Sequence, residues 1–466
     1  MDEFVDRTAE LERLTSLYES SEAELAVIYG RRRLGKTELV KHSLRDRTDV
    51  VFYQARQKTR ALQLDQFVER ASATFSGITD IRREWEPLIT YLAAQNATLV
   101  LDEFPYLIEE DESLPSVLQA LFDHEFDDSS STIVLVGSSI SMMEEAALLG
   151  NSPLYGRASV KLDITQLPFD AAMEFFDQPY SHEEQILLWG IFGGTPYYLE
   201  EAATGESIGD AVFESILTQH GPLHDDPEFV LRMELTDPTR YFAILESIAG
   251  GATTRNEIAQ AAGIDSNQLS KYLSRLERLR LVERHVPITE RKERSRRGRY
   301  RLLDPLFRFW FRFVYGSGTR YDDLGQDSFS SLVEPELADF VSSEFERLCQ
   351  RALRPLFPEQ TLVDVGQWWY QEHEVDVVGL TNERTLVAGE CKFQQSPVGY
   401  SAFAQLEGHV DELRWTPADG SDRICEYALF SRSGFEPSVE ETAVDRDDLH
   451  LFDLDDVVAA LERERS

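Results

Sequence analysis

The chain has 466 residues, more than one hydrophobic core usually serves, and at about 100–200 residues per domain it suggests three or four domains. No segment reaches the roughly 18 apolar residues that a membrane span needs, and the first thirty residues lack a secretory signal. We therefore expect a cytoplasmic protein with no membrane partner. Three cysteines (Cys349, Cys391 and Cys425) are too few and too scattered to indicate a disulfide framework or a zinc site.

The charge of the chain is strongly acidic, with 84 acidic against 46 basic residues and a net charge of −38. Only seven of the basic residues are lysines. An acidic surface poor in lysine suits a cytoplasm at molar salt, where repulsion between charges is screened within about 3 Å. A low-salt protein that avoids anions would share the net charge but not the shortage of lysine. The composition favours a halophilic protein, so local charge must decide whether it contacts nucleic acid.

Short apolar runs alternate with helical patterns over residues 24–165, which is typical of a parallel α/β sheet. Residues 166–235 have a helical pattern throughout. We predict strands at Leu25–Tyr29, Val50–Tyr53, Thr98–Leu101, Thr132–Val136 and Ser159–Ile164.

A phosphate-binding loop is predicted directly after the first strand, where the sequence fits the pattern G-x-x-x-x-G-K-[ST]. In this pattern the glycines let backbone N–H groups wrap the phosphates of ATP at the start of a helix. Lys36 should reach the β- and γ-phosphates, and the Thr37 hydroxyl should bind Mg²⁺. A turn that only closes an αβ unit is the alternative. The loop consists of Gly30, Arg31, Arg32, Arg33, Leu34, Gly35, Lys36 and Thr37.

Two carboxylates end the predicted strand Thr98–Leu101. Asp102 would hold Mg²⁺ and Glu103 would polarise the attacking water, because phosphoryl transfer depends on in-line positioning. The next strand ends at Ser138, whose hydroxyl either senses the γ-phosphate or caps the following helix.

Five short motifs resemble the archaeal branch of the AAA+/STAND ATPases. The resemblance implies ATP and Mg²⁺ as cofactors and a helical lid in which Pro196 packs near the adenine, and it allows a homo-oligomer. It also makes Arg157 the candidate for a transition-state arginine, with a purely structural arginine as the alternative. The motifs are Phe4–Leu11, Tyr29–Arg33, Asp102–Phe104, Pro153–Arg157 and Gly193–Tyr198.

Residues Arg240–Leu303 fit a winged helix, with a short helix at Arg255–Ala262 and an amphipathic helix at Asn267–Leu281. Lys271–Arg301 holds twelve basic and four acidic residues. Such a local excess of positive charge predicts contact with DNA phosphates. The alternative is that the arginines pair with acidic neighbours between domains, as in STAND ATPases that use winged helices for internal packing. The basic residues of the wing are Arg291, Lys292, Arg294, Arg296, Arg297 and Arg299.

A buried aromatic helix is expected over Asp304–Phe313, followed by a polar stretch over Gly316–Ser330. Further on, two alternating strands, Glu374–Leu380 and Arg384–Phe393, predict a hairpin centred near residue 383. In that register Asp376 lies opposite Glu390, with β-carbons about 5 Å apart, close enough to share one Mg²⁺. Lys392 lies on the same face as Glu390.

This Asp…Glu-x-Lys arrangement resembles the PD-(D/E)XK nucleases, in which two carboxylates hold the metal and the lysine positions water. The resemblance adds Glu346, in a helix at Ser343–Leu353, as a further metal ligand and Gln405 as a match on the next helix. The domain is also similar to the nuclease-like domain of unknown function that ends many archaeal ATPases of this type. An ordinary surface ion pair between Glu390 and Lys392 is the alternative.

These features predict a P-loop α/β ATPase core (1–165), a helical lid (166–235), a winged helix-turn-helix (236–303) and a C-terminal α/β restriction-endonuclease-like domain (304–466). The leading hypothesis is an ATP-hydrolysing protein that acts on DNA, with a Mg²⁺-dependent nuclease domain whose ability to cleave is left open. One alternative is a STAND-type signalling switch whose C-terminal domain only binds partners. The other is an ATP-gated transcription regulator.

Overall fold

The computed structural model describes residues 4–126, 129–150, 152–235 and 237–464, so the first residues of the predicted ATPase core and residue 236 lie outside it. The chain forms two compact units. The first contains Met1–Leu167 and Thr195–Tyr197, and the second contains Pro168–Gly194 and Tyr198–Ser466. In the described part of the chain, no helix combines the length and the apolar composition needed to cross a membrane.

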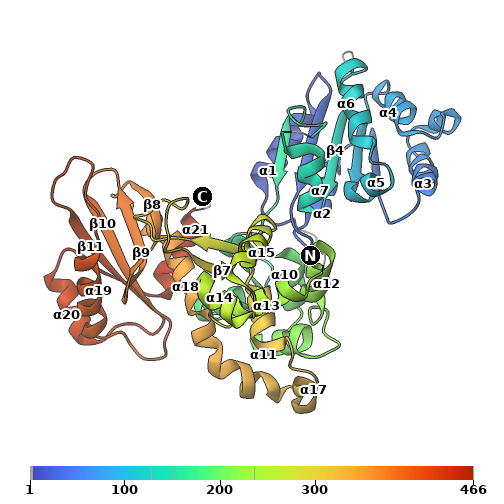
Figure 1. The fold of residues 1–466 in the computed structure, drawn as a ribbon. Coiled ribbons are helices and arrows are strands. Elements are labelled where there is room, and N and C mark those ends of the chain that lie inside the picture. Colours follow the sequence, from blue (N-terminus) through green and yellow to red (C-terminus); the bar gives the residue numbers. More distant parts are fainter. Residues whose placement is uncertain (1–3, 127–128, 151, 236, 465–466) are drawn as a thin grey trace. The chain divides into compact units, whose positions relative to one another are not determined.

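The first unit is built on a parallel five-stranded sheet (Figure 1). Its strands follow the order β2-β3-β4-β1-β5. All five predicted strands are confirmed, each with ends within one residue of the expected positions. β3 and β4 are buried along their whole length, because helices cover both faces of the sheet. The strands are β1 (Glu24–Tyr29), β2 (Val50–Gln54), β3 (Thr98–Asp102), β4 (Thr132–Gly137) and β5 (Val160–Asp163).

Alternate side chains of β1 supply two separate hydrophobic cores, one on each face of the sheet. Leu25 and Val27 pack with the helices α3 to α6, and Ala26 and Ile28 pack with α1 and α2. The sheet is therefore the middle layer of three. The helices of this unit are α1 (Thr8–Tyr18), α2 (Lys36–Ser43), α3 (Arg60–Ser72), η1 (Ser76–Asp80), α4 (Trp85–Ala93), α5 (Phe104–Glu110), α6 (Leu114–His124), α7 (Ile140–Met143) and η2 (Glu144–Leu148).

The region predicted to be helical from residue 166 is helical in the structure. One of its helices, α10, begins with Pro196 and Tyr197 of the first unit and continues in the second. The elements are α8 (Phe169–Met173), α9 (His182–Phe192), α10 (Pro196–Ala202), α11 (Ile208–Val212), η3 (Phe213–Leu217) and α12 (Asp226–Glu234).

Three helices followed by a two-stranded antiparallel sheet come next, in the predicted order. Three leucines of α15 are buried, namely Leu269, Leu273 and Leu276, and so is Leu279 directly after the helix, which confirms the expected amphipathic helix. The elements are α13 (Thr239–Ala249), α14 (Arg255–Ala261), α15 (Ser266–Arg278), β6 (Val282–His285) and β7 (Arg299–Leu302).

The aromatic run after Asp304 forms α16 (Pro305–Phe309) and the π-helical turn η4 (Trp310–Val314), and its burial is confirmed. The Asp304 carboxylate caps α16 by accepting hydrogen bonds from the backbone N–H groups of Leu306 and Phe307. The stretch Gly316–Ser330, expected to be only polar, contains α17 (Arg320–Leu324) and the start of η5 (Phe329–Val333). Buried Tyr321 and Phe329 anchor these elements.

The C-terminal part of the second unit is a mixed five-stranded sheet in the order β12-β11-β10-β9-β8. Strands β8, β9 and β10 are antiparallel neighbours, and β10, β11 and β12 are parallel. The strands are β8 (Leu362–Tyr370), β9 (His373–Thr381), β10 (Thr385–Lys392), β11 (Ile424–Ser431) and β12 (Leu449–Phe452). The helices around them are α18 (Glu334–Leu356), α19 (Tyr400–Glu412), α20 (Pro437–Asp445) and α21 (Leu454–Glu464).

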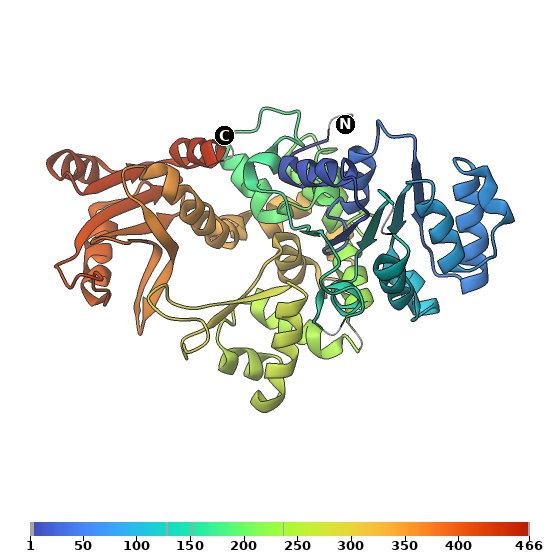
Figure 2. The same cartoon turned by 90° about the horizontal axis from the view of Figure 1, so that it is seen from above.

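Helices α18 and α19 pack against opposite faces of this sheet (Figures 1 and 2). Leu353 of α18 lies against Gly379 of β9, whereas Phe403 of α19 lies in a core with the neighbouring residues Val378 and Leu380. The predicted alternation of β10 is therefore wrong. Seven of its eight residues are buried, because both of its faces are covered.

Two helical glycines of the second unit give a matched test of this packing. Gly190 of α9 faces α18, and a β-carbon added to it would lie 2.7 Å from a methyl of Val341. Gly408 of α19 has no atom within 4 Å of that position. Gly190→Ala should destabilise the protein by about 1–3 kcal/mol through overpacking. Gly408→Ala should stabilise it by about 0.5–1 kcal/mol, because alanine loses less entropy in a helix.

Urea unfolding of both variants at one salt concentration measures the two changes. Equal effects of the two substitutions would contradict the close approach of α9 to α18.

Candidate functional site

The predicted phosphate-binding loop connects β1 to α2. Gly30 has φ 148°, and a β-carbon there would collide with the backbone carbonyl of Ile164, so only glycine fits. Lys36 is buried, and its Nζ donates to the carbonyl oxygens of Gly30 (2.9 Å) and Arg31 (2.6 Å). The lysine therefore lies back on its own loop. These two carbonyl oxygens accept the hydrogen bonds that Lys36 would donate to a bound phosphate.

Asp102 lies beside this loop at the carboxyl end of β3. Its Oδ2 accepts from the hydroxyl of Thr37 and from Nε2 of Gln54, each at 3.0 Å. Burial raises the pKa of Asp102, and the nearby charge of Glu103 adds to this, while the hydrogen bond from Thr37 opposes it. The structure thus brings together Thr37 and Asp102, the two residues expected to share Mg²⁺.

Glu103 follows Asp102 with a left-handed backbone (φ 52°), a strained conformation for a residue with a side chain. Its Oε1 accepts from the hydroxyl of Ser138 at 3.1 Å. This contact arises because β4 lies between β1 and β3, so that Ser138 comes to the same edge of the sheet as the loop. Helix α7 begins after Ser139 rather than Ser138, so Ser138 binds the candidate catalytic glutamate instead of capping the helix.

The remaining predicted nucleotide residues are Pro196 and Arg157. Pro196 lies against Gly35, with its Cγ 3.7 Å from where a β-carbon of that glycine would be. The Arg33 guanidinium lies over the ring of Tyr197 at 4.1 Å. Arg157 is instead held by both oxygens of Asp123, at 2.8 and 2.6 Å, and it would have to leave that pair to reach a phosphate.

Two contacts at this site were not predicted. Gln54 donates to Asp102, and Arg32 of the loop donates to the Tyr106 hydroxyl at 2.8 Å. Gln54 directly follows a predicted strand, at the sheet edge where the loop lies, and that position was the available signal. Tyr106 carried no comparable signal, because its contact spans 74 residues.

The carboxylates predicted in the C-terminal domain do converge. Gly389 pairs with Val377 across the hairpin, so the next pair in this register is Glu390 with Asp376, as predicted. Asp376 Oδ2 accepts from the backbone N–H of Cys391 at 3.0 Å, and the buried Glu390 accepts from Lys392 Nζ at 2.5 Å. The ion pair of Glu390 with Lys392 is therefore present, but at a buried carboxylate rather than on an open surface.

Glu346 of α18 comes close to the same pair. Its Oε2 accepts from Nε2 of Gln367 at 2.8 Å. Burial, and then the charges of Asp376, Glu374 and Glu390, raise the pKa of Glu346 to about 8. Burial and the charge of Glu390 likewise raise the pKa of Asp376 to about 7. Three carboxylates therefore repel one another at this end of the hairpin.

Mg²⁺ and Mn²⁺ prefer carboxylate oxygens as ligands, and three carboxylates lie close together here. The donor chemistry therefore fits a divalent cation. Among residues 4–464, leaving aside those not described, no group of three or more His, Cys, Asp or Glu side chains is arranged to hold a metal ion as it stands. Side-chain rotation would have to complete the set. Gln405 is exposed on α19, and no hydrogen bond among the described residues joins it to these carboxylates.

The basic hairpin lies against β8 and β9. The backbone N–H of Ile288 donates to the carbonyl of Gln367 at 2.8 Å, and Trp369 Nε1 donates to the carbonyl of Arg297 at 3.2 Å. Arg299 pairs with Glu374 at 2.6 Å and lies over the Trp369 ring. Arg297 lies over the ring of Tyr370. Arg299 thus pairs with an acidic residue of β9, as the internal-packing alternative expects, and Arg297 contacts β8 although it is itself exposed. The other basic residues of the hairpin are also exposed, namely Arg291, Lys292, Arg294 and Arg296.

Comparison with protein families gives two matches. Residues 4–202 match an ATPase domain predominantly from Archaea, and residues 310–402 match a family described as archaea bacterial proteins of unknown function. The chain therefore carries an archaeal-type ATPase domain, which the parallel sheet and its phosphate-binding loop form.

Individual proteins are also similar. The uncharacterized protein MJECL04 of Methanocaldococcus jannaschii is 31% identical over 396 residues, which are 84% of this chain and 88% of that protein. The Walker-type ATPase PABY2304 of Pyrococcus abyssi has 17% identity and a TM-score of 0.51 over 66% of this chain and 96% of its own, a likeness of fold. The Aeropyrum pernix ORC2 protein, solved in ADPNP–ADP complexes, has 15% identity and a TM-score of 0.48 over 70% of this chain and 96% of its own.

The raised pKa of Glu346 predicts how the stability of the folded protein changes with pH. In the unfolded chain a glutamate titrates near 4.3, so between about 4.5 and 8 the folded protein binds the additional proton. The stability that protonated Glu346 contributes is present below this window and is lost as the pH rises through it. In EDTA, Glu346→Gln should be only slightly more stable than wild type at pH 5. At pH 8 it should be more stable by on the order of 1–3 kcal/mol.

Urea unfolding at both pH values measures the difference, and the exposed neighbour Glu372→Gln is the control. A Glu346→Gln protein less stable than wild type at pH 8 would contradict the crowding of the three carboxylates.

Proposed function

Because this chain belongs to the family of the Methanocaldococcus jannaschii protein MJECL04 and carries an archaeal ATPase domain, we propose that it hydrolyses ATP with Mg²⁺ and cleaves DNA in its C-terminal domain. The observation that supports ATP hydrolysis is the meeting of Lys36, Thr37, Asp102 and Glu103 at one edge of the sheet. The contacts of each of these residues are compatible with a role in ATP hydrolysis.

Lys36 would exchange the two loop carbonyls for the β- and γ-phosphate oxygens, which is a stronger, charge-assisted contact. Thr37 and Asp102 would hold Mg²⁺, which supplies positive charge next to the phosphates. Glu103 would accept a proton from the attacking water, and the hydroxyl of Ser138 would keep its carboxylate in place. Pro196 and Tyr197 would cover the bound nucleotide from the loop side.

The proposal of a nuclease rests on Asp376 and Glu390, which face each other across the β9–β10 hairpin beside Glu346 and Lys392. Asp376, Glu390 and Glu346 would hold a divalent cation between them, which would stabilise the charge that develops on a phosphodiester. Lys392 would give up its pair with Glu390 to orient water. The helices α13 to α15 with β6 and β7 are proposed to form a winged helix, whose exposed basic residues would contact the DNA backbone.

A signalling switch of STAND type is the second candidate. Two observations favour it: Arg297 and Arg299 of the wing are used for packing against β8 and β9, and the described carboxylates do not form a complete metal site as they stand. In that case the C-terminal domain would bind partners without cleaving DNA.

The nucleotide site is tested by Lys36→Ala and Glu103→Gln. Lys36→Ala should weaken Mg²⁺-ATP binding about tenfold or more, because a charge-assisted contact to the phosphates is lost. Glu103→Gln should bind ATP as wild type does but lose turnover by about 100-fold or more. Lys41→Ala on the same helix, where the lysine is 53% exposed, is the matched control. ATP titration and phosphate release measure both, and unchanged ATP binding by Lys36→Ala would refute the assignment of the loop.

The nuclease site is tested by cleavage of plasmid DNA with Mg²⁺ or Mn²⁺, with and without ATP. Asp376→Asn should abolish cleavage, and Lys392→Ala should slow it by about 100-fold, as expected for loss of a group that positions water. Asp364→Asn, which removes an exposed carboxylate from the neighbouring strand β8, should cleave like wild type. Wild-type protein that hydrolyses ATP but cuts no DNA under any of these conditions would favour the signalling switch.

A further inference from the structure

A cavity of about 450 Å³ lies inside the second unit, next to the wall that carries Glu346. Its volume is within the range of about 300–1,000 Å³ that small-molecule sites occupy. The walls come from the end of α13 and the turn after it, the strands β6 and β7, the segment α16–η4, helix α18, and the strands β8 and β9. Five arginines line it, namely Arg299, Arg301, Arg308, Arg312 and Arg347.

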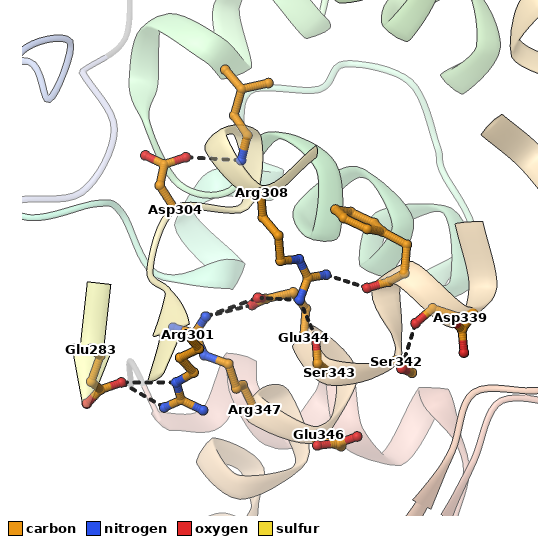
Figure 3. Close-up of polar contacts among 12 residues, drawn as sticks. Glu283, Arg301, Asp304, Arg308, Asp339, Ser342, Ser343, Glu344, Glu346 and Arg347 are labelled. Atoms are coloured by element: carbon orange, nitrogen blue, oxygen red, sulfur yellow. Dashed lines mark hydrogen bonds and ion pairs between the residues drawn. The ribbon is translucent and has the colours of Figure 1, made fainter. Parts of the chain in front are cut away.

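Three of these arginines form the inner wall and share only two carboxylates (Figure 3). Glu344 pairs with Arg347 at 3.0 Å and with Arg308 at 3.5 Å, while Arg301 pairs with Glu283 at 2.8 Å. The Arg308 side chain is only 15% exposed. Glu346, the other acidic group on this wall, accepts from Gln367 instead. The inner wall thus holds one more positive charge than its ion pairs neutralise.

Two side-chain nitrogens on the walls are also unsatisfied. Nε of Arg308 and Nδ1 of His285 are buried and have no hydrogen-bond partner among the described residues. Burial, together with the charges of Arg301, Arg299 and Arg347, lowers the pKa of His285 to about 3, so the ring is neutral at neutral pH. Buried polar nitrogens without partners are rare in folded proteins. An oxygen-rich ligand would satisfy Nε of Arg308, and it would satisfy Nδ1 of His285 in the tautomer that carries its proton there.

The mouth of the cavity carries three carboxylates and two arginines. Arg299 pairs with Glu374 and Arg312 with Glu336, each at 2.6 Å, and Asp339 is exposed. Such exposed pairs contribute about 0–1 kcal/mol and rearrange easily. The positive charge without its own carboxylate therefore lies among Arg301, Arg308 and Arg347, and Arg308 is the least exposed of the three.

We propose that this cavity binds the phosphate group of a nucleotide, free or within a nucleic acid strand, with Arg301, Arg308 and Arg347 as its anchors. Guanidinium groups match phosphate oxygens with paired N–H donors, which a carboxylate-paired arginine can still offer from its free edge. Phe340, which lies under the Arg308 guanidinium at 4.1 Å, gives the apolar surface against which a sugar or base would pack. The strand form of this proposal rests on the proposed nuclease site, because Glu346 belongs to both walls; the free-nucleotide form does not.

The test uses the full chain with Lys36→Ala and EDTA, so that neither the ATP site nor metal-dependent cleavage contributes. The probes are AMP, followed by calorimetry, and a fluorescein-labelled twelve-nucleotide single strand of thymidine, followed by anisotropy, at the lowest salt at which the protein stays folded. Adding Arg301→Gln and Arg347→Gln together should weaken binding of at least one probe about tenfold or more.

The control replaces Arg291, Arg294 and Arg296 with serine, which removes exposed hairpin charges that do not line the cavity. It should leave AMP binding unchanged. If the cavity variant loses binding of both AMP and the strand, a free nucleotide phosphate is sufficient for binding. If it loses binding of the strand alone, the ligand is a nucleic acid strand. Because Glu344 is buried with Arg347, the single variant Arg301→Gln is the second test, with its folding checked by thermal melting.

No binding of either probe to the Lys36→Ala protein, or unchanged binding by folded Arg301→Gln, would overturn the proposal. Both outcomes would leave ATP hydrolysis and DNA cleavage by the wild-type protein unaffected.

Discussion

The buried carboxylate of Glu344 fixes the helix on which both proposed sites of the second unit depend. It is held by Arg308 from α16 and Arg347 from α18 itself, and burying it without both cations would cost several kcal/mol. Residues two apart on a helix point about 200° away from each other. With Glu344 turned toward α16, Glu346 is turned toward the sheet, where Asp376 and Glu390 lie.

In the two proposals, one helix would therefore contribute to two neighbouring sites. Glu346 adds a carboxylate to a pair whose mutual repulsion a divalent cation would relieve, and Arg347 adds a guanidinium to the arginines that line the cavity. A cation and a phosphate are the two ligands that phosphodiester chemistry brings together. In the first unit, site residues likewise meet at one place, the carboxyl edge of the parallel sheet. Thr37, Asp102 and Ser138 meet there because β4 lies between β1 and β3.

The features that could be predicted from the sequence are those with a local period or spacing. The strand periodicity gave all five strands of the first sheet, the loop spacing placed Lys36 and Thr37, and the turn near residue 383 set Asp376 opposite Glu390. The contacts of Arg308 with Glu344 and of Arg297 with Trp369 join residues 36 and 72 positions apart. No local pattern in the sequence predicts such contacts. The continuous burial of β10 was missed for the same reason, since it depends on helices that cover both faces.

The central claim is that Glu346, Asp376 and Glu390 act as one divalent-cation site, and Mn²⁺ binding tests it most directly. Electron paramagnetic resonance counts free Mn²⁺ during titration of the nucleotide-free protein, so the phosphate-binding loop contributes little. The account predicts about one tight site per chain, lost in Glu390→Gln, because each carboxylate supplies part of the ligand set. Absence of tight binding, or tight binding that survives Glu390→Gln, would contradict it.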